Sequence, residues 1–258
     1  MSKLLFVADF HGNYVATMAL DAEIKKIQPD EIFFLGDAIG KGPDNDKTCD
    51  WVRANCNHFI KGNWDRMLNY SRIPNGYPMH EFYRNQIGEE RFNWLESLPF
   101  EDEVLISGLN FRLLHGRPSD LNYHPYLTIE ELKKGLWGYG KNYTSVTEDD
   151  AGNVTLVGTK RKFDGFIGAD CHMPYIQTLP SGGYAINTGS VGNSLGVANC
   201  HFLLIEGELG STEKTPLKMC ILSIPYDNEK AALRAKETVD LPDSEAFQKE
   251  VLTGVYSR

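Results

Sequence analysis

The chain has 258 residues, with 26 Lys and Arg against 35 Asp and Glu, which gives a net charge of −9. This length suits one large α/β domain or two small ones, and 41% hydrophobic residues are enough to form a sizeable core. The 24% of charged residues is ordinary for a globular protein and excludes a wholly disordered or collagen-like chain. The acidic balance argues against an extended basic nucleic-acid surface. It does not exclude an enzyme that handles phosphate, because bound metal ions reverse the local field of carboxylates.

The cysteines and the N-terminus indicate where the protein resides. The five cysteines are odd in number and form no CxxC pair, so we expect reduced, mostly buried thiols in a cytoplasmic protein. The apolar run at residues 4–8 is too short for a signal peptide, and no stretch approaches the length of a membrane-spanning helix. We therefore expect neither secretion nor membrane insertion. No sequence feature predicts the oligomeric state.

The first sixty residues alternate short apolar strands with helices. Strands are predicted over residues 3–8, 31–35 and 58–60. A helical pattern covers residues 14–27, and a second helix lies near 46–55. This repetition predicts right-handed crossovers and a largely parallel start to the sheet of an α/β fold.

The later chain is predicted to be richer in antiparallel strands. A hairpin is expected over 104–114, and helices over 90–98 and 128–137, the latter opened by a capping box of Thr128 and Glu131. Four further strands are predicted at residues 163–167, 184–187, 201–205 and 217–224. Gly-rich turns favour antiparallel pairing among them, and two helices are expected in 228–253. One domain over 1–258 is the simplest organisation, with excursions near 66–99 and 119–161 that would wall a cleft.

Hard polar residues recur where the predicted strands end. They are Asp9 and His11 after the first strand, Asp37 after the second, Asn63 after the third, His115 after the hairpin, and Asp170 and His172 after the next strand. In open α/β sheets, ligands collect outside the carboxyl ends of strands. These side chains are therefore expected to meet at one site.

The chemistry of this set points to hard or borderline metal ions. Carboxylate and amide oxygens with imidazole nitrogens suit Mn²⁺, Fe or Zn²⁺ rather than a Cys-rich structural zinc site. Two such ions about 3.5–4 Å apart clamp an in-line displacement at phosphorus, with a shared hydroxide as nucleophile. Each group alone also has a structural explanation: Asp37 follows a glycine, as in ordinary turns, and His115 alone would more often be a core histidine. The combination in this order is much more specific.

The ordered motifs resemble those of the calcineurin-like metallophosphoesterase superfamily. They are Asp9-x-His11, Gly36-Asp37 with Gly40-Lys41-Gly42-Pro43, Gly62-Asn63-Trp64-Asp65, His115-Gly116, Asp170-x-His172 and the segment Asn187–Gly192. The resemblance implies a four-layer α/β/β/α sandwich of two mixed sheets. It implies one ion held by Asp9, His11, Asp37 and His172, and a second held by Asp37, Asn63, His115 and Asp170. Asp37 would be the bridge, and Asp37, Asn63 and His115 the catalytic residues.

Two positions depart from the family pattern. Trp64 stands where the family usually has a histidine that stabilises the transition state or protonates the leaving group, and Asp170 replaces another histidine. Asp170 can still bind a hard metal and would favour Mn²⁺ or Fe over Zn²⁺. A general acid typically contributes about 10²–10⁴-fold. We therefore expect phosphoanhydrides and activated esters, whose leaving groups depart unaided, as substrates.

The substrate class is suggested by a narrower resemblance. A Gly-Asn-Trp-acidic motif with Tyr226-Asp227 is similar to a bacterial subgroup that includes diadenosine tetraphosphate hydrolases. Trp64 would then stack on a nucleobase, or alternatively pack against residues 66–99. Candidates for phosphate contacts are Arg66, Arg117 and Lys41, and His124 is a candidate substitute acid.

The predicted function is thus a dinuclear metal-dependent phosphohydrolase. It would act by metal-hydroxide attack on a phosphodiester or phosphoanhydride of a small phosphorylated substrate, a nucleotide or dinucleoside polyphosphate, with Mn or Fe as the preferred ions and Zn possible. Two alternatives stay open. One is a phosphomonoesterase similar to protein serine/threonine phosphatases, and the other is a metal-binding scaffold whose catalysis has weakened.

Overall fold

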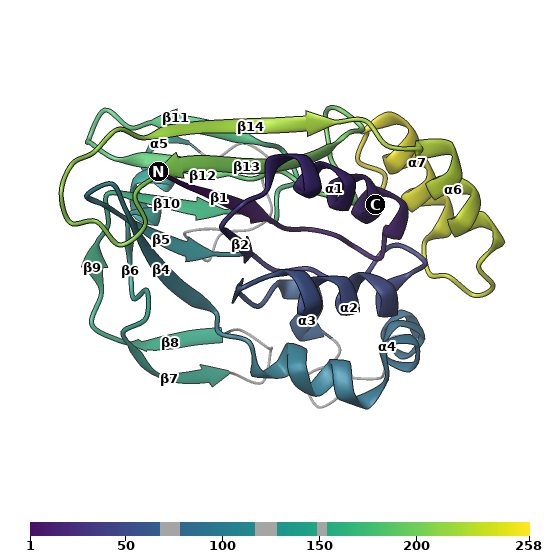
Figure 1. Ribbon diagram of the computed structural model, residues 1–258. Coiled ribbons are helices and arrows are strands. Elements are labelled where there is room, and N and C mark those ends of the chain that lie inside the picture. Colours follow the sequence, from purple (N-terminus) through teal and green to yellow (C-terminus); the bar gives the residue numbers. More distant parts are fainter. Residues whose placement is uncertain (68–77, 117–127, 149–153) are drawn as a thin grey trace.

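Two five-stranded mixed sheets packed face to face form the centre of the molecule (Figure 1). The computed structural model describes residues 1–67, 78–116, 128–148 and 154–258. The apolar layer between the sheets takes residues from both, for example Phe6 and Phe33 of one sheet and Phe111 and Ile167 of the other. Burial on both faces explains why the central strands are nearly continuous apolar runs in the sequence.

The first sheet has the strand order β14-β13-β1-β2-β3. Its members are β1 (Ser2–Val7), β2 (Glu31–Phe34), β3 (His58–Phe59), β13 (Cys200–Gly207) and β14 (Lys218–Ile224). The strands β1, β2 and β3 run parallel, which confirms the predicted parallel start. The strand β13 pairs antiparallel with both β1 and β14.

The second sheet has the order β11-β12-β10-β5-β4. Its members are β4 (Glu101–Ile106), β5 (Leu109–Leu114), β10 (Gly165–Gly168), β11 (Tyr175–Thr178) and β12 (Tyr184–Asn187). The predicted β4–β5 hairpin is confirmed, and β11 pairs antiparallel with β12 across the Gly-rich turn. The expectation of antiparallel pairing was wrong for β10, which runs parallel to both β5 and β12 because the short strand β11 takes the antiparallel place beside β12.

Helices cover the outer faces and complete the four-layer α/β/β/α sandwich. The first sheet is covered by α1 (Tyr14–Ile27), α2 (Asn45–Asn55), α4 (Pro78–Ser97), α6 (Asn228–Glu237) and α7 (Ser244–Thr253). Leu5 and Val7 of β1 face these helices, whereas Leu4 and Phe6 face the second sheet. In the part of the chain that the structure describes, α5 (Ile129–Gly135), with the predicted capping box of Thr128 and Glu131, packs on the outer face of the second sheet.

The structure differs from the sequence-based expectations mainly between residues 78 and 162. The helix predicted over 90–98 begins at Pro78 and contains a non-helical residue, Gly88, with φ 70° and ψ 175°. Two small strand pairs were not predicted: β6 (Trp137–Gly138) with β9 (Arg161–Lys162), and β7 (Tyr143–Glu148) with β8 (Val154–Gly158). Val146 and Val157 of the second pair are exposed, so no buried face imposes a period-2 pattern there.

Two smaller expectations can be compared with the structure. All five cysteines are free thiols, and four of them are buried. Among the described residues, no helix combines the length and the apolar character that crossing a bilayer requires.

A buried ion pair joins the β4–β5 hairpin to the segment after α5. Arg112 on β5 donates from Nε to Glu101 Oε2 at 2.9 Å and from its terminal nitrogen to Glu101 Oε1. Its other nitrogen donates to the carbonyls of Gly135 and Trp137, and Glu101 accepts from the backbone N–H of Gly140 at 3.0 Å. Every charged atom of the pair has a partner, which is the condition under which a buried pair is tolerated.

We predict that Arg112→Met lowers the free energy of unfolding by about 3–5 kcal/mol, because it leaves the buried Glu101 carboxylate without its counter-charge. The matched control is Lys218→Met, since Lys218 pairs with Glu206 on the exposed surface and its loss should change stability very little. Urea denaturation of both variants measures the difference. Equal effects of the two substitutions would contradict the prediction.

Candidate metal centre

The parallel strands of both sheets end at one place. In the first sheet, β1 leads into Asp9 and His11, and β2 leads into Asp37. In the second sheet, β5 leads into His115, and β10 leads into His172. Because the two sheets are packed together, side chains separated by more than 160 residues come within hydrogen-bond distance of each other. The convergence expected from the sequence is therefore present in the structure.

The backbone at these strand ends adopts an unusual conformation. Five of the predicted ligands have left-handed φ values: Asp9 (54°), His11 (47°), Asp37 (61°), Asp170 (67°) and His172 (58°). Asp, Asn and His tolerate this region better than most residues, but it still costs free energy and tends to cluster at functional sites. These turns direct the side chains toward one centre, and the backbone is strained as a result.

Three histidines present the same ring nitrogen to the centre. Each Nδ1 lies next to a backbone carbonyl: His11 3.1 Å from Ile39 O, His115 2.6 Å from Leu35 O, and His172 2.6 Å from Asn193 O. Because a carbonyl can only accept, Nδ1 must carry the proton in the neutral ring, and Nε2 is left with a lone pair. This is the arrangement in which outer hydrogen bonds orient histidines toward a metal ion.

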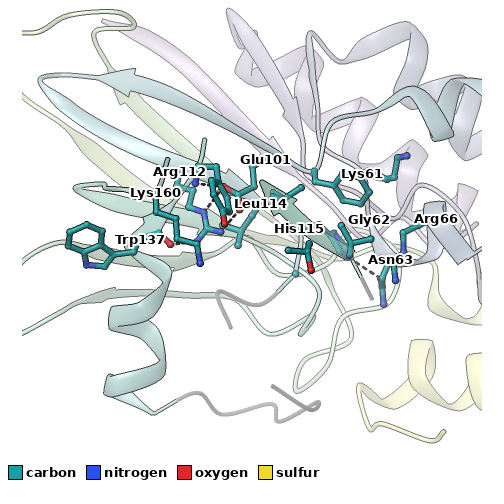
Figure 2. A pocket seen from close by; sticks show the side chains of 16 residues that line it. Lys61, Gly62, Asn63, Arg66, Glu101, Arg112, Leu114, His115, Trp137 and Lys160 are labelled. Carbon is teal, nitrogen blue, oxygen red and sulfur yellow. Dashed lines mark hydrogen bonds and ion pairs between the residues drawn. The ribbon is translucent and has the colours of Figure 1, made fainter. Parts of the chain in front are cut away.

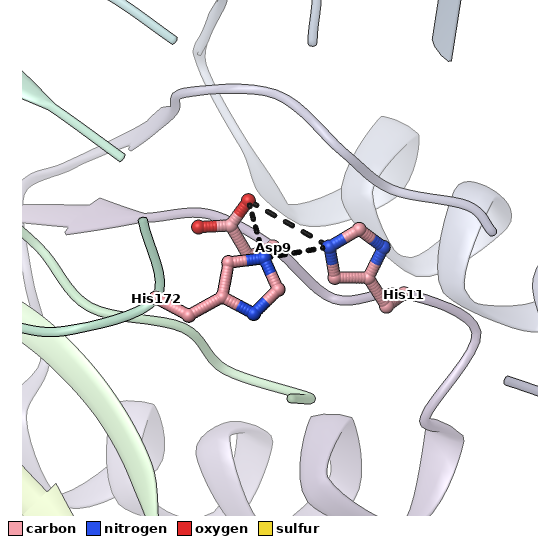
Figure 3. Close-up of side chains that lie close together, drawn as sticks. All are labelled: Asp9, His11 and His172. Carbon is pink, nitrogen blue, oxygen red and sulfur yellow. Dashed lines mark hydrogen bonds and ion pairs between the residues drawn. The ribbon is translucent and has the colours of Figure 1, made fainter. Parts of the chain in front are cut away.

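The first cluster consists of Asp9, His11 and His172 (Figure 3). The Nε2 atoms of His11 and His172 are 3.0 Å apart, so two lone pairs face each other. The Oδ1 atom of Asp9 is buried without a hydrogen-bond partner, 3.9 Å from His11 Nε2 and 3.8 Å from His172 Nε2. Buried polar atoms are normally satisfied, and a cation between these three would satisfy all of them. The residues therefore fit a metal ion.

The second cluster lies beside the first and consists of Asp9, Asp37 and His115. The Oδ2 atom of Asp37 is 3.3 Å from His115 Nε2 and 3.6 Å from His11 Nε2, so it faces both clusters. Asn63 Oδ1 lies 3.2 Å from His115 Nε2, and Asp170 Oδ1 lies 3.9 Å from it. The structure thus brings all seven predicted ligands together.

The surroundings of the three histidines shift their pKa values in different directions. Burial, assisted by Lys41, lowers the pKa of His11 and of His172 well below the ordinary value, so both rings are neutral at pH 7. Burial also acts to lower the pKa of His115, but the carboxylates of Asp37, Asp9 and Asp170 outweigh it and raise that pKa well above the ordinary value. Without a metal ion, His115 therefore holds a proton that a metal must displace.

Asp65 holds the loops around Asp37 in position, a role that we did not predict. Its fully buried carboxylate accepts from the backbone N–H groups of Asp37 (2.8 Å), Ala38 (3.0 Å) and Gly62 (2.9 Å). Burial, with the nearby Asp37 charge adding to it, raises the pKa of Asp65 to about 7. A Cβ at Gly62 would lie 2.0 Å from Asp37 Oδ1, so only glycine allows this approach. The signal was present in the sequence, since Asp65 ends the Gly62–Asp65 motif.

The C-terminal helix reaches the centre through Asn193, which was also missed. The Asn193 side chain accepts from Lys41 Nζ at 3.0 Å and donates to Glu250 at 3.1 Å, while its carbonyl orients His172. Glu250 on α7 is fully buried and also accepts from Arg258 Nε at 3.3 Å. Burial lowers the pKa of Lys41 to about 8. No local pattern marks the contact of Glu250 with Asn193, because these two residues lie far apart in the sequence.

A cavity of about 620 Å³ opens beside the second cluster (Figure 2). Asn63 and His115 form one end of it, and Arg66 lines it there. The wall includes Trp137, Tyr139, residues 154–156 and Lys160 from the chain between α5 and β10. Ligands held at the second cluster would therefore extend into this cavity.

The predicted substrate-binding residues have different surroundings. Arg66 lines the cavity, whereas Lys41 is buried behind the first cluster. Trp64 packs edge-on against the rings of His11 and Tyr83, with centroids 5.8 Å apart in each case, and is not among the residues that line the cavity. This packing against α4 agrees with the alternative prediction that Trp64 packs against residues 66–99. Arg117 and His124 lie outside the described residues.

Metal binding is predicted to weaken as the pH falls through the raised pKa of His115. The metal needs the neutral ring, so each ion bound at the second cluster releases a proton, and affinity for Mn²⁺ should fall about tenfold per pH unit below that pKa. Calorimetric titration with Mn²⁺ between pH 6 and 9, in buffers of different ionisation enthalpy, measures both quantities. An affinity independent of pH, with no proton released, would contradict the prediction.

The comparisons with known proteins agree with this geometry. The family model described as calcineurin-like phosphoesterase matches residues 2–177. A metallophosphoesterase from Sphaerobacter thermophilus has a similar structure, with a TM-score of 0.69 and 18% identity, covering 98% of this chain and 99% of that chain. A hypothetical protein from Pyrococcus horikoshii OT3 superposes with a TM-score of 0.70 at 15% identity, covering 100% of both chains. No curated protein matches the chain. At these identities the structures show a shared fold, and it is the family model, matching most of the sequence, that shows that this chain belongs to the calcineurin-like phosphoesterase family.

Proposed function

We propose that this protein is a cytoplasmic, dinuclear metal-dependent phosphohydrolase that cleaves a phosphoanhydride or phosphodiester bond in a small nucleotide-type substrate. The observation that carries the proposal is the 3.0 Å contact between His11 Nε2 and His172 Nε2, beside the unpartnered Asp9 Oδ1. Five ligands of both clusters come from turns with strained backbone, and such strain is retained where function requires it.

Asp37 is the proposed bridge between the two ions. Both Asp9 and Asp37 lie between His11 and His115, but Asp37 Oδ2 is closer to their Nε2 atoms, at 3.6 and 3.3 Å against 3.9 Å for Asp9 Oδ1 in each case. The other oxygen of Asp37 accepts from the backbone N–H of Trp64 at 2.9 Å, which fixes the orientation of the carboxylate. We assign Asp9, His11, Asp37 and His172 to one ion and Asp37, Asn63, His115 and Asp170 to the other.

The donor set favours hard or borderline ions. It contains carboxylates, an amide and imidazoles, and no thiolate, which suits Mn²⁺ or Fe, with Zn²⁺ as a further candidate. When bound, such ions supply Lewis acidity toward the phosphoryl oxygens and lower the pKa of water. The surrounding residues hold the metal-binding side chains at fixed positions. Arg66 contributes a positive charge where a phosphate would enter the cavity.

Trp64 at the position of a family proton donor affects which phosphate–oxygen bonds would break most readily. Its indole ring carries no acidic proton to give to a departing oxygen, and it fills its position by packing against Tyr83. A leaving group must then depart as an anion, which phosphate and aryl oxides do far more easily than alkoxides. This supports phosphoanhydrides and activated diesters as substrates.

A metal-binding scaffold is the second candidate function. It is favoured by the same replacement of a family histidine by Trp64, together with Asp170 in place of another histidine. The two candidates differ in a simple respect: a scaffold would bind metal stoichiometrically without turning over any phosphate substrate.

Removing the bridging carboxylate is predicted to abolish both metal binding and hydrolysis. Asp37→Asn keeps an acceptor for Trp64 N–H but removes the negative charge, and we expect metal affinity and turnover to fall by at least about 100-fold. Asp240→Asn, an exposed substitution, is the control. Metal content by mass spectrometry and hydrolysis with added Mn²⁺ are measured on both. Undiminished turnover in Asp37→Asn would refute the proposal.

The leaving-group argument predicts a substrate order and a gain of function. With Mn²⁺, wild-type protein should hydrolyse dinucleoside polyphosphates and aryl phosphodiesters faster than alkyl phosphomonoesters or phosphopeptides. Trp64→His should then raise activity on alkyl esters by up to about 10²-fold, more than on aryl esters, because it restores a proton donor. Trp64→Phe separates this effect from lost packing. Faster cleavage of alkyl esters than of anhydrides by the wild type would overturn the argument.

A further inference from the structure

The cavity beside the metal centre has a second end far from the proposed ligands. Figure 2 shows Asn63 and His115 at one end and Trp137 at the other, with Arg112 and Lys160 between them. Trp137 is 53% exposed, although a large aromatic ring on a soluble protein is usually more buried. Lys160 Nζ lies 5.3 Å from the centre of the neighbouring Tyr139 ring. The distal end therefore combines two aromatic rings with a cation.

The distal end is held rigidly relative to the metal centre. Arg112 donates to the carbonyl of Trp137 at 3.1 Å, and its partner Glu101 accepts from the backbone N–H of Tyr139 at 3.1 Å. Arg112 and the residue before His115 lie on the same strand, β5. The backbone carrying the aromatic rings is thus hydrogen-bonded to the strand that leads into a proposed metal ligand. A preorganised separation of this kind lowers the entropy cost of binding an extended ligand.

The charges along the cavity favour an anion over its whole length. Glu101 is neutralised by Arg112, and the other lysine and arginine side chains of the described lining are Lys61, Arg66 and Lys160. Lys61 is buried and donates from Nζ to the carbonyl of Glu96 at 2.6 Å, so Lys160 is the cation at the distal end. Within the described ranges, Lys160 has no carboxylate within ion-pair distance. In a chain with a net charge of −9, a lysine without a nearby carboxylate at the distal end favours a phosphate group beyond the reacting one.

We propose that the distal end is a nucleoside-binding subsite and that the substrate is a nucleoside polyphosphate. The reacting phosphate lies at the metal centre, further phosphates lie toward Lys160, and the base stacks on the aromatic surface of Trp137 and Tyr139. This inference rests on the proposed hydrolase function, which already has a nucleotide-type substrate, and adds to it the site where the nucleoside binds. It also moves base recognition from Trp64, which is packed against Tyr83, to Trp137, whose ring is accessible.

The test compares ATP with inorganic tripolyphosphate, which has the same three phosphates and no nucleoside. Trp137→Ala should lower the ratio of kcat/KM for ATP to that for tripolyphosphate by about 5- to 100-fold, mainly through KM. Trp137→Phe should restore most of the ratio, because it keeps a stacking surface. An unchanged ratio in Trp137→Ala, or failure of Trp137→Phe to restore it, would overturn the stacking role.

Lysine variants test the phosphate contacts separately. Lys160→Ala should lower kcat/KM for both compounds, whereas Lys162→Ala should change neither, since Lys162 is exposed on the same segment and does not line the cavity. Equal effects of the two lysine variants would overturn the role of Lys160. Thermal unfolding of every variant confirms that the fold is retained.

A binding measurement distinguishes failure of the subsite from failure of the proposed function. Titration of wild-type protein with AMP should quench tryptophan fluorescence, and Trp137→Ala should abolish the change. If the wild type hydrolyses neither compound but AMP still causes the quench, the hydrolase proposal fails and the subsite stands. Hydrolysis without any quench or any preference for ATP would overturn the subsite alone.

Discussion

The centre of this protein depends on three imidazole rings whose Nδ1 protons are committed to backbone carbonyls. That commitment leaves His11, His115 and His172 with their Nε2 atoms turned toward one another and toward buried carboxylates. Between His11 and His172 there is no proton to share, and Asp9 Oδ1 finds no donor. A cation between them would remove both conflicts, so the residues are arranged to fit an ion.

The rest of the structure is rigid enough to hold His11, His172 and Asp9 in this arrangement. Relaxation would require the turns after β1, β2 and β10 to leave their left-handed conformations, and they are held from several sides. The Asp65 carboxylate accepts hydrogen bonds from three backbone N–H groups around Asp37. The carbonyl of Asn193 orients His172, and the Asn193 side chain is hydrogen-bonded to Lys41 and to Glu250 on α7. Elements from the N-terminal strands to the C-terminal helix thus contribute to one centre.

Charge is distributed unevenly around this centre. The clusters themselves are rich in carboxylate, whereas the neighbouring cavity carries cationic side chains that extend from Arg66 to Lys160. A phosphorylated ligand would be attracted by the cavity but repelled by the clusters until metal ions neutralise them. The protein is acidic overall, and this local arrangement is what makes phosphate chemistry compatible with its net charge.

Sequence alone determined the elements and residues that depend on local patterns. Apolar runs ending in Asp9, Asp37, Asn63, His115 and Asp170 predicted both the strands and the side chains that the structure brings together, because a buried strand and the turn after it consist of contiguous residues. The positions of Glu250 and Trp137 could not be obtained in this way. Their roles come from contacts across large sequence separations: the carboxylate of Glu250 meets Asn193 only when α7 packs beside the centre, and Trp137 reaches the cavity only when Arg112 and Glu101 fix its backbone. The small strand pairs between residues 137 and 162 were missed for a related reason, since exposed strands without a buried face carry no periodic signal. The candidate ligands could therefore be predicted from local sequence, whereas the shape and charge of the space around them were decided by the packing of the two sheets.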